Sequence, residues 1–139
     1  EKMTRFNITL DQGISMVFEA LNNSQGGEIF VPKIPSYRVT DVAKAICPKC
    51  STPITGIRPG EKIHEEMITQ ADSYTTYDLG KYYIIFPNNQ ELINTYKSKN
   101  IHMTKVENNF SYNSRDNKEF LSVEDIKLLI SKHIKIDPE

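Results

Sequence analysis

The apolar stretches of this 139-residue chain are short, and their length limits what the chain can fold into. The longest of them, such as Tyr82–Phe86, fall far below the roughly 20 residues that a membrane-spanning helix needs. The chain also lacks the succession of Val-, Ile- and Leu-rich runs that is typical of strands buried in a parallel sheet. We therefore expect neither a membrane-spanning segment nor a complete nucleotide-binding core of parallel strands.

The segment 9–23 has the signals of an amphipathic helix. Thr9 and Gln12 are spaced as a capping box, in which each side chain satisfies a backbone N–H that the helix leaves without a partner. Apolar residues then recur at helical spacing along one face. They are Ile14, Val17, Phe18 and Leu21. Gly26 and Gly27 follow, and they supply the backbone freedom of a turn that ends the helix.

Two further segments predict helices. Residues 39–46 carry apolar side chains at helical spacing, and Pro48 ends that pattern. Residues 121–134 begin with Ser122 and Asp125 at the spacing of a second capping box. We expect the buried stripe of this last helix to consist of Ile126, Leu129 and Ile130.

The segments between these helices predict a small α/β unit. Strands are expected at residues 28–31, 53–57 and 81–86, each bounded by Gly or Pro. A further helix is expected at 61–68, and the polar loop region after residue 88 is expected to contain only a short helical stretch at 91–97. Helices and strands thus alternate, which predicts an α/β fold with about four helices and a small mixed sheet.

Charge and cysteine content exclude several classes of protein. The chain has 17 Lys and Arg against 18 Asp and Glu, with no basic stripe, so we expect no nucleic-acid partner. Two cysteines are too few for a disulfide framework, which favours a reducing, cytoplasmic setting.

The pair Cys47 and Cys50 in "CPKC" resembles half of a zinc site or a redox motif. Structural zinc needs four ligands, and His64, His102 and His133 lie at no recognised spacing from the pair. A redox pair should open a helix that follows a strand, whereas this pair follows a helix. We therefore predict two incidental thiols in a turn and no metal site.

Other catalytic motifs are coincidental or absent. Tyr77 and Lys81 have the Tyr-x-x-x-Lys spacing of short-chain dehydrogenases, but Gly80 and the following strand deny them a shared helix face. "HEEMI", which begins at His64, lacks the second His of a zinc protease helix. The sequence contains neither glycine-rich phosphate motif and no Ser/His/Asp or Cys/His constellation, so it predicts no catalytic residue of its own.

The stretch "GIRPGEKIHEEM" places an Arg and a carboxylate on either side of a Pro-Gly turn. The guanidinium of Arg58 can make a bidentate contact with phosphate oxygens, and Glu61 can accept hydrogen bonds from sugar hydroxyls. Equally, Glu61 can be a first-turn acid favoured by a helix dipole. Arg5, just before the first predicted helix, has the same two interpretations, and the residue types alone leave them open.

Several stretches together resemble one family. "MTRFNITLDQG", "GGEIFVPKIPS", "TDVAKAI" and "GIRPGEKIHEEMI" occur in the order found in the inverting UDP-N-acetylglucosamine 4,6-dehydratases. These are extended short-chain dehydrogenase/reductases of polysaccharide biosynthesis that act early in pseudaminic acid synthesis. "YYIIFP" and "FSYNSRDNKEFLSVEDIKLLI" are similar to the C-terminal end of that family. The resemblance covers nearly the whole chain and is loosest over residues 88–107.

The resemblance implies that residues 1–139 form one C-terminal, substrate-binding domain, with an Asn-rich loop region at about 88–118. The N-terminal Rossmann half of the family carries the NADP-binding glycines and the catalytic Asp, Lys and Tyr, and this half is missing here. The chain is therefore expected to be an excised or truncated piece, inactive alone and without bound cofactor. The face that would pack on the missing half is expected to favour self-association.

The resemblance also assigns site residues. In related nucleotide-sugar enzymes an Arg-x-Gly-Asp/Glu turn offers its Arg to the diphosphate and its acid to the uridine ribose. "RPGE" matches this turn, which implies that Arg58 binds the diphosphate and Glu61 the ribose. The Arg of "MTRF" implies a second diphosphate ligand, Arg5, with Thr4 a weaker candidate beside it. The partner implied is a UDP-sugar, UDP-N-acetylglucosamine.

Two alternatives remain open. A UDP-sugar 4-epimerase of capsule or O-antigen synthesis belongs to the same superfamily, and the two enzymes differ in catalytic residues that this chain lacks. A stand-alone, non-enzymatic binding module that uses "CPKC" for metal is the alternative from another class.

Overall fold

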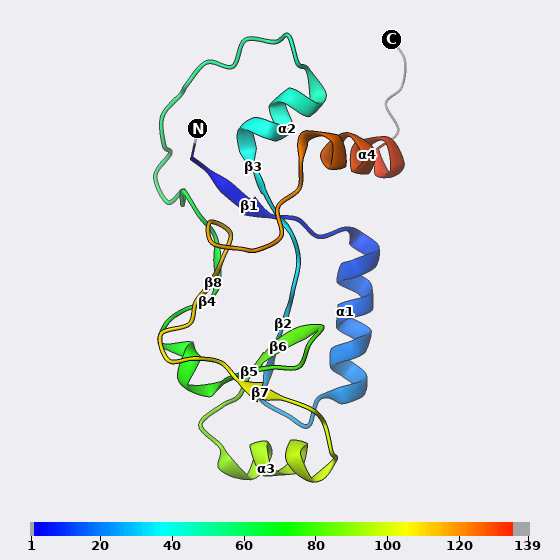
Figure 1. Ribbon diagram of the computed structural model, residues 1–139, viewed down its shortest axis with the longest axis vertical. Helices are drawn as coiled ribbons and strands as arrows, with labels where there is room; N and C mark the ends of the chain where they lie inside the picture. The colour runs from blue at the N-terminus through cyan, green and yellow to red at the C-terminus, as the bar shows by residue number, and fades with distance from the viewer. Residues whose placement is uncertain (1, 135–139) are drawn as a thin grey trace. The chain divides into compact units, whose positions relative to one another are not determined.

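The computed structural model describes residues 2–134, and these form two compact units that we describe separately (Figure 1). The described residues of the first unit are 2–7, 35–65 and 114–134, and those of the second unit are 8–34 and 66–113. The chain therefore passes between the units four times.

The second unit is built on an antiparallel sheet of four strands in the order β2-β6-β5-β7. The strands are β2 (Ile29–Pro32), β6 (Tyr82–Ile85), β5 (Thr76–Asp78) and β7 (Thr104–Lys105). A short 3-10 helix, η1 (Asp72–Thr75), leads into β5. The central strand β6 pairs with β2 and with β5, which confirms the strand predicted at 81–86.

The core of the second unit lies between this sheet and helix α3 (Gln90–Ser98). Successive side chains of a strand point to opposite faces, so alternate residues from Tyr82 to Phe86 share one face. Asn89 caps α3 by accepting hydrogen bonds from the first backbone N–H groups of the helix. The buried core cluster consists of Tyr82, Ile84, Phe86, Leu92, Ile93 and Tyr96. Sheet and helix thus bury a common apolar layer.

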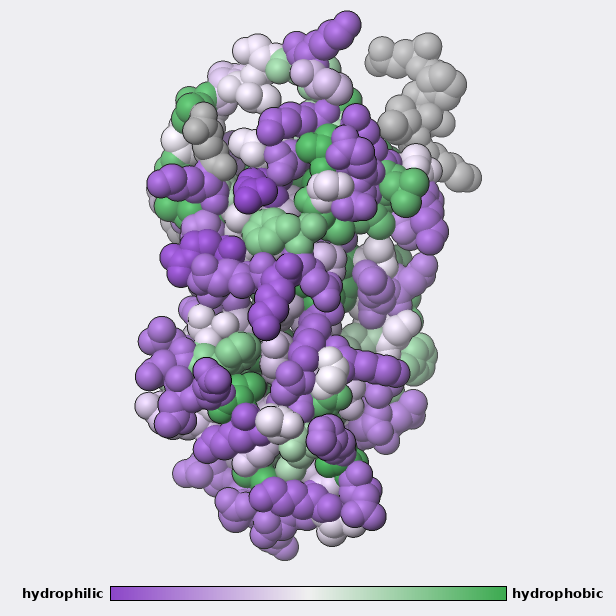
Figure 2. Space-filling view, in the orientation of Figure 1, coloured by the Kyte–Doolittle hydropathy of each residue, from purple (hydrophilic) through white to green (hydrophobic). Residues whose placement is uncertain are grey.

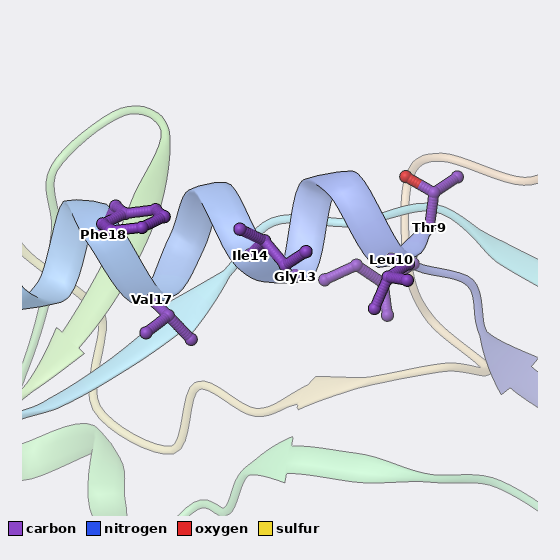
Figure 3. A pocket seen from close by; sticks show the side chains of 7 residues that line it. Thr9, Leu10, Gly13, Ile14, Val17 and Phe18 are labelled. Carbon is purple, nitrogen blue, oxygen red and sulfur yellow. The ribbon is translucent and has the colours of Figure 1, made fainter.

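Helix α1 (Leu10–Asn23) has the predicted capping box of Thr9 and Gln12. Met16 packs against the core cluster, but no residue of α1 is fully buried. The predicted apolar stripe is instead exposed along the helix (Figure 3). We call the four predicted residues, together with the exposed Leu10 at the start of the helix, the α1 stripe: Leu10, Ile14, Val17, Phe18 and Leu21. The sequence thus predicted the helix itself, but not which of its faces contacts the rest of the second unit.

The first unit joins a strand pair to a helix pair. Strands β1 (Thr4–Phe6) and β3 (Ser36–Arg38) are antiparallel, and β3 runs directly into helix α2 (Val39–Ile46). Helix α2 packs on α4 (Val123–His133), which has the predicted capping box of Ser122 and Asp125. Of the stripe predicted to be buried on α4, Ile126 is buried, whereas Leu129 and Ile130 are only half-buried.

Two predicted elements are wrong. Residues 53–57 form no strand, because the whole segment 47–65 lacks regular structure, and residues 61–68 form no helix, because their last three residues are the strand β4 (Glu66–Ile68). Gly56 and Gly60 have φ angles of 83° and 81°, a conformation outside both helix and strand. After this segment, β4 (Glu66–Ile68) pairs with β8 (Tyr112–Asn113).

The α/β class is confirmed, and the described residues contain four α-helices. The short helix predicted at 91–97 is confirmed as α3, and the strand predicted at 28–31 as β2. All pairs of named strands are antiparallel, and an isolated parallel bridge joins Ser36 to Phe120.

The prediction of two free thiols is corrected by the structure. Cys47 and Cys50 form a disulfide directly after α2, because the helix-ending turn brings their Cα atoms to 5.4 Å, a separation that such a bond can span. Among residues 2–134, no helix is long and apolar enough to cross a membrane. Polar side chains cover most of the face drawn in Figure 2, with apolar ones in scattered patches.

Candidate anion-binding site

The residues Arg58 to Glu61 form a closed turn in the first unit. The backbone N–H of Glu61 donates to the carbonyl oxygen of Arg58 at 3.1 Å. Pro59 and Gly60 occupy the two central positions, and Gly60 has the positive φ of 81° that a type II turn requires at its second central residue. The Pro-Gly pair therefore determines this local shape.

The side chain of Glu61 strengthens the same turn. Its Oε2 atom accepts a hydrogen bond from the backbone N–H of Arg58 at 3.1 Å. Both residues are exposed, and the guanidinium of Arg58 makes no hydrogen bond or ion pair within the described chain. The guanidinium of Arg58 can thus donate two hydrogen bonds to an oxyanion such as a phosphate, and the carboxylate of Glu61 lies three residues away in the sequence.

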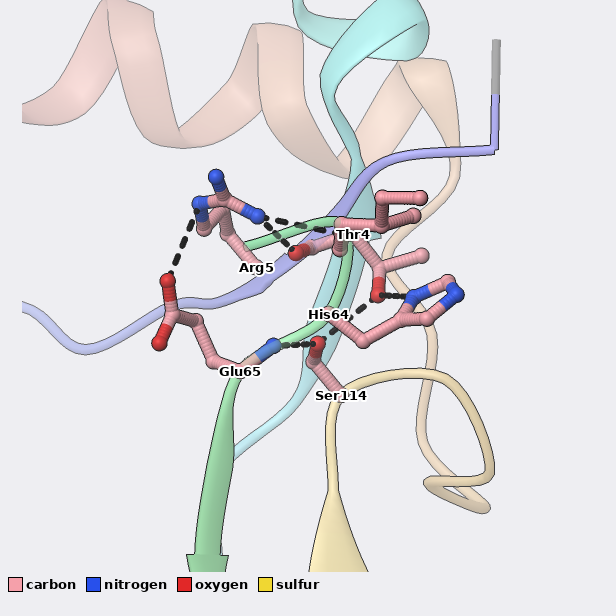
Figure 4. A network of polar contacts seen from close by, with 6 residues as sticks. Thr4, Arg5, His64, Glu65 and Ser114 are labelled. Carbon is pink, nitrogen blue, oxygen red and sulfur yellow. Dashed lines mark hydrogen bonds and ion pairs between the residues drawn. The ribbon is translucent and has the colours of Figure 1, made fainter. Parts of the chain in front are cut away.

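Arg5 lies in a more ordered setting on strand β1 (Figure 4). Its Nε atom pairs with Oε1 of Glu65 at 3.4 Å, and its Nη1 atom donates to the carbonyl oxygens of Thr4 at 2.7 Å and Ile63 at 3.2 Å. The remaining nitrogen, Nη2, has no partner within residues 2–134. The side chain is 22% exposed, so this nitrogen remains available to a ligand oxygen.

Thr4 is buried, and its hydroxyl is engaged by the protein. Its Oγ1 atom lies 2.8 Å from Nδ1 of His64 and 2.7 Å from Oγ of Ser114. Ser114 Oγ in turn accepts the backbone N–H of Glu65 at 2.9 Å. We call Thr4, Arg5, His64, Glu65 and Ser114 the β1 cluster. In this cluster the side chain of Thr4 holds neighbouring segments together, while the assignment of Thr4 to a substrate stays a prediction.

Backbone hydrogen bonds join the same segments. The N–H of Thr4 donates to the carbonyl of Ile63 at 3.0 Å, and the N–H of Ser114 donates to the carbonyl of Glu65 at 2.8 Å. The chain therefore runs from the Arg58–Glu61 turn into a segment that is hydrogen-bonded to the strand of Arg5. The structure places both predicted arginines in the first unit: Arg58 begins the segment 58–65, and Arg5 lies on the strand that is hydrogen-bonded to Ile63 of this segment.

Sequence reasoning missed three members of the β1 cluster. His64 and Glu65 belong to the quoted stretch that contains Arg58, but their residue types gave no reason to pair them with β1. Ser114 follows Glu65 by 49 residues, a separation that no local pattern can bridge. The signal that was available was the closeness of "HEE" to "RPGE" in the sequence.

Metals and nucleotide cofactors each need a particular arrangement of ligand residues. Residues 2–134 contain no group of three or more His, Cys, Asp or Glu side chains that could hold a metal ion. A phosphate-binding glycine loop leads from a strand into a helix, whereas Gly26 and Gly27 lie between helix α1 and strand β2. The residues present here therefore do not fit NADP.

The site and the fold define an α/β module in which an exposed turn and a partly buried polar cluster each carry an arginine suited to phosphate oxygens. Comparison with known proteins identifies the group to which this module belongs. The chain belongs to the polysaccharide biosynthesis protein family, whose model matches residues 1–87.

The similarity to individual proteins confirms the resemblance found in the motifs. The chain is 41% identical over 137 residues to the UDP-N-acetylglucosamine 4,6-dehydratase (inverting) of Campylobacter jejuni subsp. jejuni serotype O:2, covering 94% of this chain and 40% of that protein. It is 34% identical over 87 residues to the UDP-glucose 4-epimerase of Rickettsia canadensis, covering 60% of this chain and 26% of that enzyme.

A solved structure is similar as well. The X-ray structure of Pen from Bacillus thuringiensis matches with a TM-score of 0.74 at 26% sequence identity, covering 94% of this chain and 39% of that one. The chain thus spans about 40% of the length of the curated dehydratases it matches.

Proposed function

We propose that this chain is the UDP-sugar-binding part of an inverting UDP-N-acetylglucosamine 4,6-dehydratase. The identity of 41% to such an enzyme over 94% of the chain carries this proposal. The exposed Arg58 and the partly exposed Arg5 support it, because a diphosphate carries about two negative charges that the two arginines together can neutralise. Glu61 then accepts hydrogen bonds from the ribose of the nucleotide.

The binding energy of the diphosphate and the ribose serves the chemical step. Contacts that are remote from the reacting carbons hold the sugar in place and so contribute to its orientation. In the proposed whole enzyme, NADP and the residues that oxidise, dehydrate and reduce the sugar lie outside this chain. The 139-residue chain alone is therefore proposed to bind UDP-sugar weakly and to catalyse no dehydration.

The product of the proposed enzyme is a precursor of bacterial surface or flagellar glycans, such as pseudaminic acid. The proposed location is the cytoplasm, where nucleotide sugars are made. Both statements extend the similarity to the dehydratases, whereas the geometry supports only the UDP-binding role.

Calorimetric titration with UDP and UDP-N-acetylglucosamine tests the proposed role of the turn. We expect the wild-type chain to bind UDP and Arg58→Ala to bind it roughly tenfold to hundredfold more weakly, because a charge-assisted, bidentate contact is lost. Arg58 makes no contact through its guanidinium within the described chain, so its removal should leave the urea unfolding curve unchanged. Equal UDP affinity of the two chains would reject the turn as a diphosphate ligand.

A UDP-sugar 4-epimerase is the second candidate function. The 34% identity to the Rickettsia canadensis epimerase supports it, but this match covers only 60% of the chain. The two reactions differ in product, since a dehydratase releases a 4-keto-6-deoxy sugar and an epimerase an intact 4-epimer. Incubating a full-length family member that contains this sequence with UDP-N-acetylglucosamine and identifying the product by NMR would separate them.

A stand-alone metal-binding module is the least supported alternative. The Cys47–Cys50 disulfide leaves no thiolate at "CPKC" to hold a metal. Stoichiometric zinc in the purified, reduced chain would nevertheless favour this module over the dehydratase part.

We further propose that the 139-residue chain self-associates through the α1 stripe. The five stripe residues are between 46% and 79% exposed and contiguous along one helix, a patch larger than the scattered apolar residues of a monomer surface. The match covers 40% of the Campylobacter jejuni dehydratase, and in the proposed whole enzyme a part of the remaining length would cover this stripe. In this chain alone, the same stripe on a second copy is the complementary surface.

Sedimentation velocity of the purified chain tests this proposal. We expect a concentration-dependent dimer in the wild type and a monomer in Val17→Lys, because a charge in the middle of the stripe would have to be desolvated. Ser15→Lys is the matched control, since Ser15 lies on the same exposed helix outside the stripe and should leave the dimer intact. A wild-type chain that remains monomeric at all concentrations would contradict the proposal.

A further inference from the structure

The guanidinium of Arg5 is held in one orientation by acceptors on two segments. Its Nε and Nη1 atoms contact Glu65 and the carbonyls of Thr4 and Ile63, while Nη2 has no partner in residues 2–134 (Figure 4). An exposed arginine samples many rotamers, and ordering it on binding a ligand costs conformational entropy. In this structure much of that ordering is already present before any ligand binds.

The backbone of Glu65 is itself held by a buried residue, Ser114. The backbone of Glu65 makes two hydrogen bonds with Ser114, one from its N–H to Oγ and one from the Ser114 N–H to its carbonyl. Ser114 is fully buried and also contacts the buried hydroxyl of Thr4 at 2.7 Å. The segment that carries the carboxylate is thereby anchored to the strand that carries Arg5.

We propose that Glu65 is a positioning residue for diphosphate binding: anchored by Ser114, it fixes the Arg5 guanidinium so that Nη2 is presented to a phosphate oxygen. This inference rests on the proposed function, because it presumes that the ligand of Arg5 is the diphosphate of a UDP-sugar. It adds to that function a residue that never touches the ligand and acts through Arg5.

The negative charge of Glu65 has an opposite effect that the experiment must separate. A carboxylate near a diphosphate repels it, whereas a carboxylate that orients an arginine favours binding. The guanidinium is only partly exposed, and Oε1 of Glu65 lies 3.4 Å from its Nε atom as an ion-pair partner, which leaves Nη2 for a ligand oxygen. The proposal requires the orienting effect to be the larger one, and Glu65→Gln measures the balance of the two effects.

The test compares Glu65→Gln with Glu66→Gln in the 139-residue chain. Glu66 is the exposed neighbour on β4, and its side chain has no ion pair or hydrogen bond in the described residues, so its variant removes the same charge without disturbing Arg5. Each chain is titrated with UDP and with uridine, which lacks the diphosphate. The Nε–H signal of Arg5 is followed by NMR in the same samples without ligand.

We expect Glu65→Gln to weaken UDP binding about tenfold and to leave uridine binding unchanged, whereas Glu66→Gln changes neither. A purely structural defect would weaken both ligands, so the ratio of the two affinities reports positioning. We also expect the Arg5 Nε–H signal to be sharp and slow to exchange in the wild type and broadened in Glu65→Gln.

Other results would overturn the inference. Unchanged or tighter UDP binding in Glu65→Gln would show that Glu65 does not position Arg5 for a diphosphate. An Arg5 signal that is indifferent to Glu65 would do the same. If the wild type binds UDP no better than Arg5→Ala, the proposed ligand itself is wrong, and the NMR signal still decides separately whether Glu65 orders the guanidinium.

Discussion

Arg5 and Arg58 belong to the same unit but lie in opposite surroundings. Arg5 is on a strand, and its guanidinium contacts Glu65 and two backbone carbonyls. The neighbouring Thr4 is buried, and its hydroxyl contacts that of the buried Ser114. Arg58 is on an exposed turn, and only its backbone is held, by Glu61. In the proposed site, Arg5 would be ordered before a ligand arrives, whereas Arg58 would have to be ordered by the ligand.

This difference matters for how a diphosphate would be bound. An ordered arginine contributes its full interaction with the ligand, whereas a mobile one loses side-chain entropy on binding. A mobile arginine can in exchange adapt to the ligand and close over it. The β1 cluster and the Arg58–Glu61 turn thus represent a preformed part and an adaptable part of one proposed site.

The largest expected effect comes from removing the hydroxyl on which the β1 cluster depends. Ser114→Ala leaves the hydroxyl of Thr4 and the backbone N–H of Glu65 without their buried partner. We expect the free energy of unfolding to fall by about 1–3 kcal/mol, measured by urea denaturation. The control is Ser51→Ala in the exposed segment 47–65, which should stay within about 0.5 kcal/mol of the wild type.

An unchanged stability of Ser114→Ala would contradict the contrast between Arg5 and Arg58. An unfolding curve of Ser114→Ala that overlays that of the wild type would show that the contact between the hydroxyl groups of Ser114 and Thr4 does not stabilise the β1 cluster. Arg5 would then be as adaptable as Arg58, and the division into a preformed and an adaptable part would be lost.

A smaller effect is expected from replacing the glycine of the turn by alanine. The same substitution at a glycine in helix α1 provides the control. Gly60→Ala places a Cβ at a φ of 81°, which costs about 1 kcal/mol and should reduce UDP affinity roughly fivefold in calorimetry. Gly13→Ala is the matched control, since Gly13 is helical with open space around an added Cβ. It should raise stability by up to about 1 kcal/mol and leave UDP affinity unchanged.

The two glycine variants separate the effect of the turn on ligand binding from its effect on global stability. Because the turn is exposed, Gly60→Ala should alter ligand binding more than global unfolding. If Gly60→Ala bound UDP as tightly as the wild type, the closed turn would not be needed for binding, and the adaptable part would consist of the Arg58 side chain alone.

The sequence by itself determined the local elements that depend on neighbours along the chain. Capping boxes at Thr9 and Ser122 predicted where α1 and α4 begin, because the spacing of three residues fixes the hydrogen bonds. The alternation from Tyr82 to Phe86, bounded by Gly80 and Pro87, predicted β6. The motifs also identified the family, which the comparisons confirm.

Only the tertiary structure decided what depends on contacts across the sequence. Strands of two or three residues, such as β1 and β8, carry too little local pattern to be predicted and form because a partner strand pairs with them. The same holds for the contact of Ser114 with Thr4, 110 residues apart. The sequence predicted that Arg5 is a candidate ligand, and the fold decided which groups orient it, since hydrogen bonds between distant segments are set by tertiary packing.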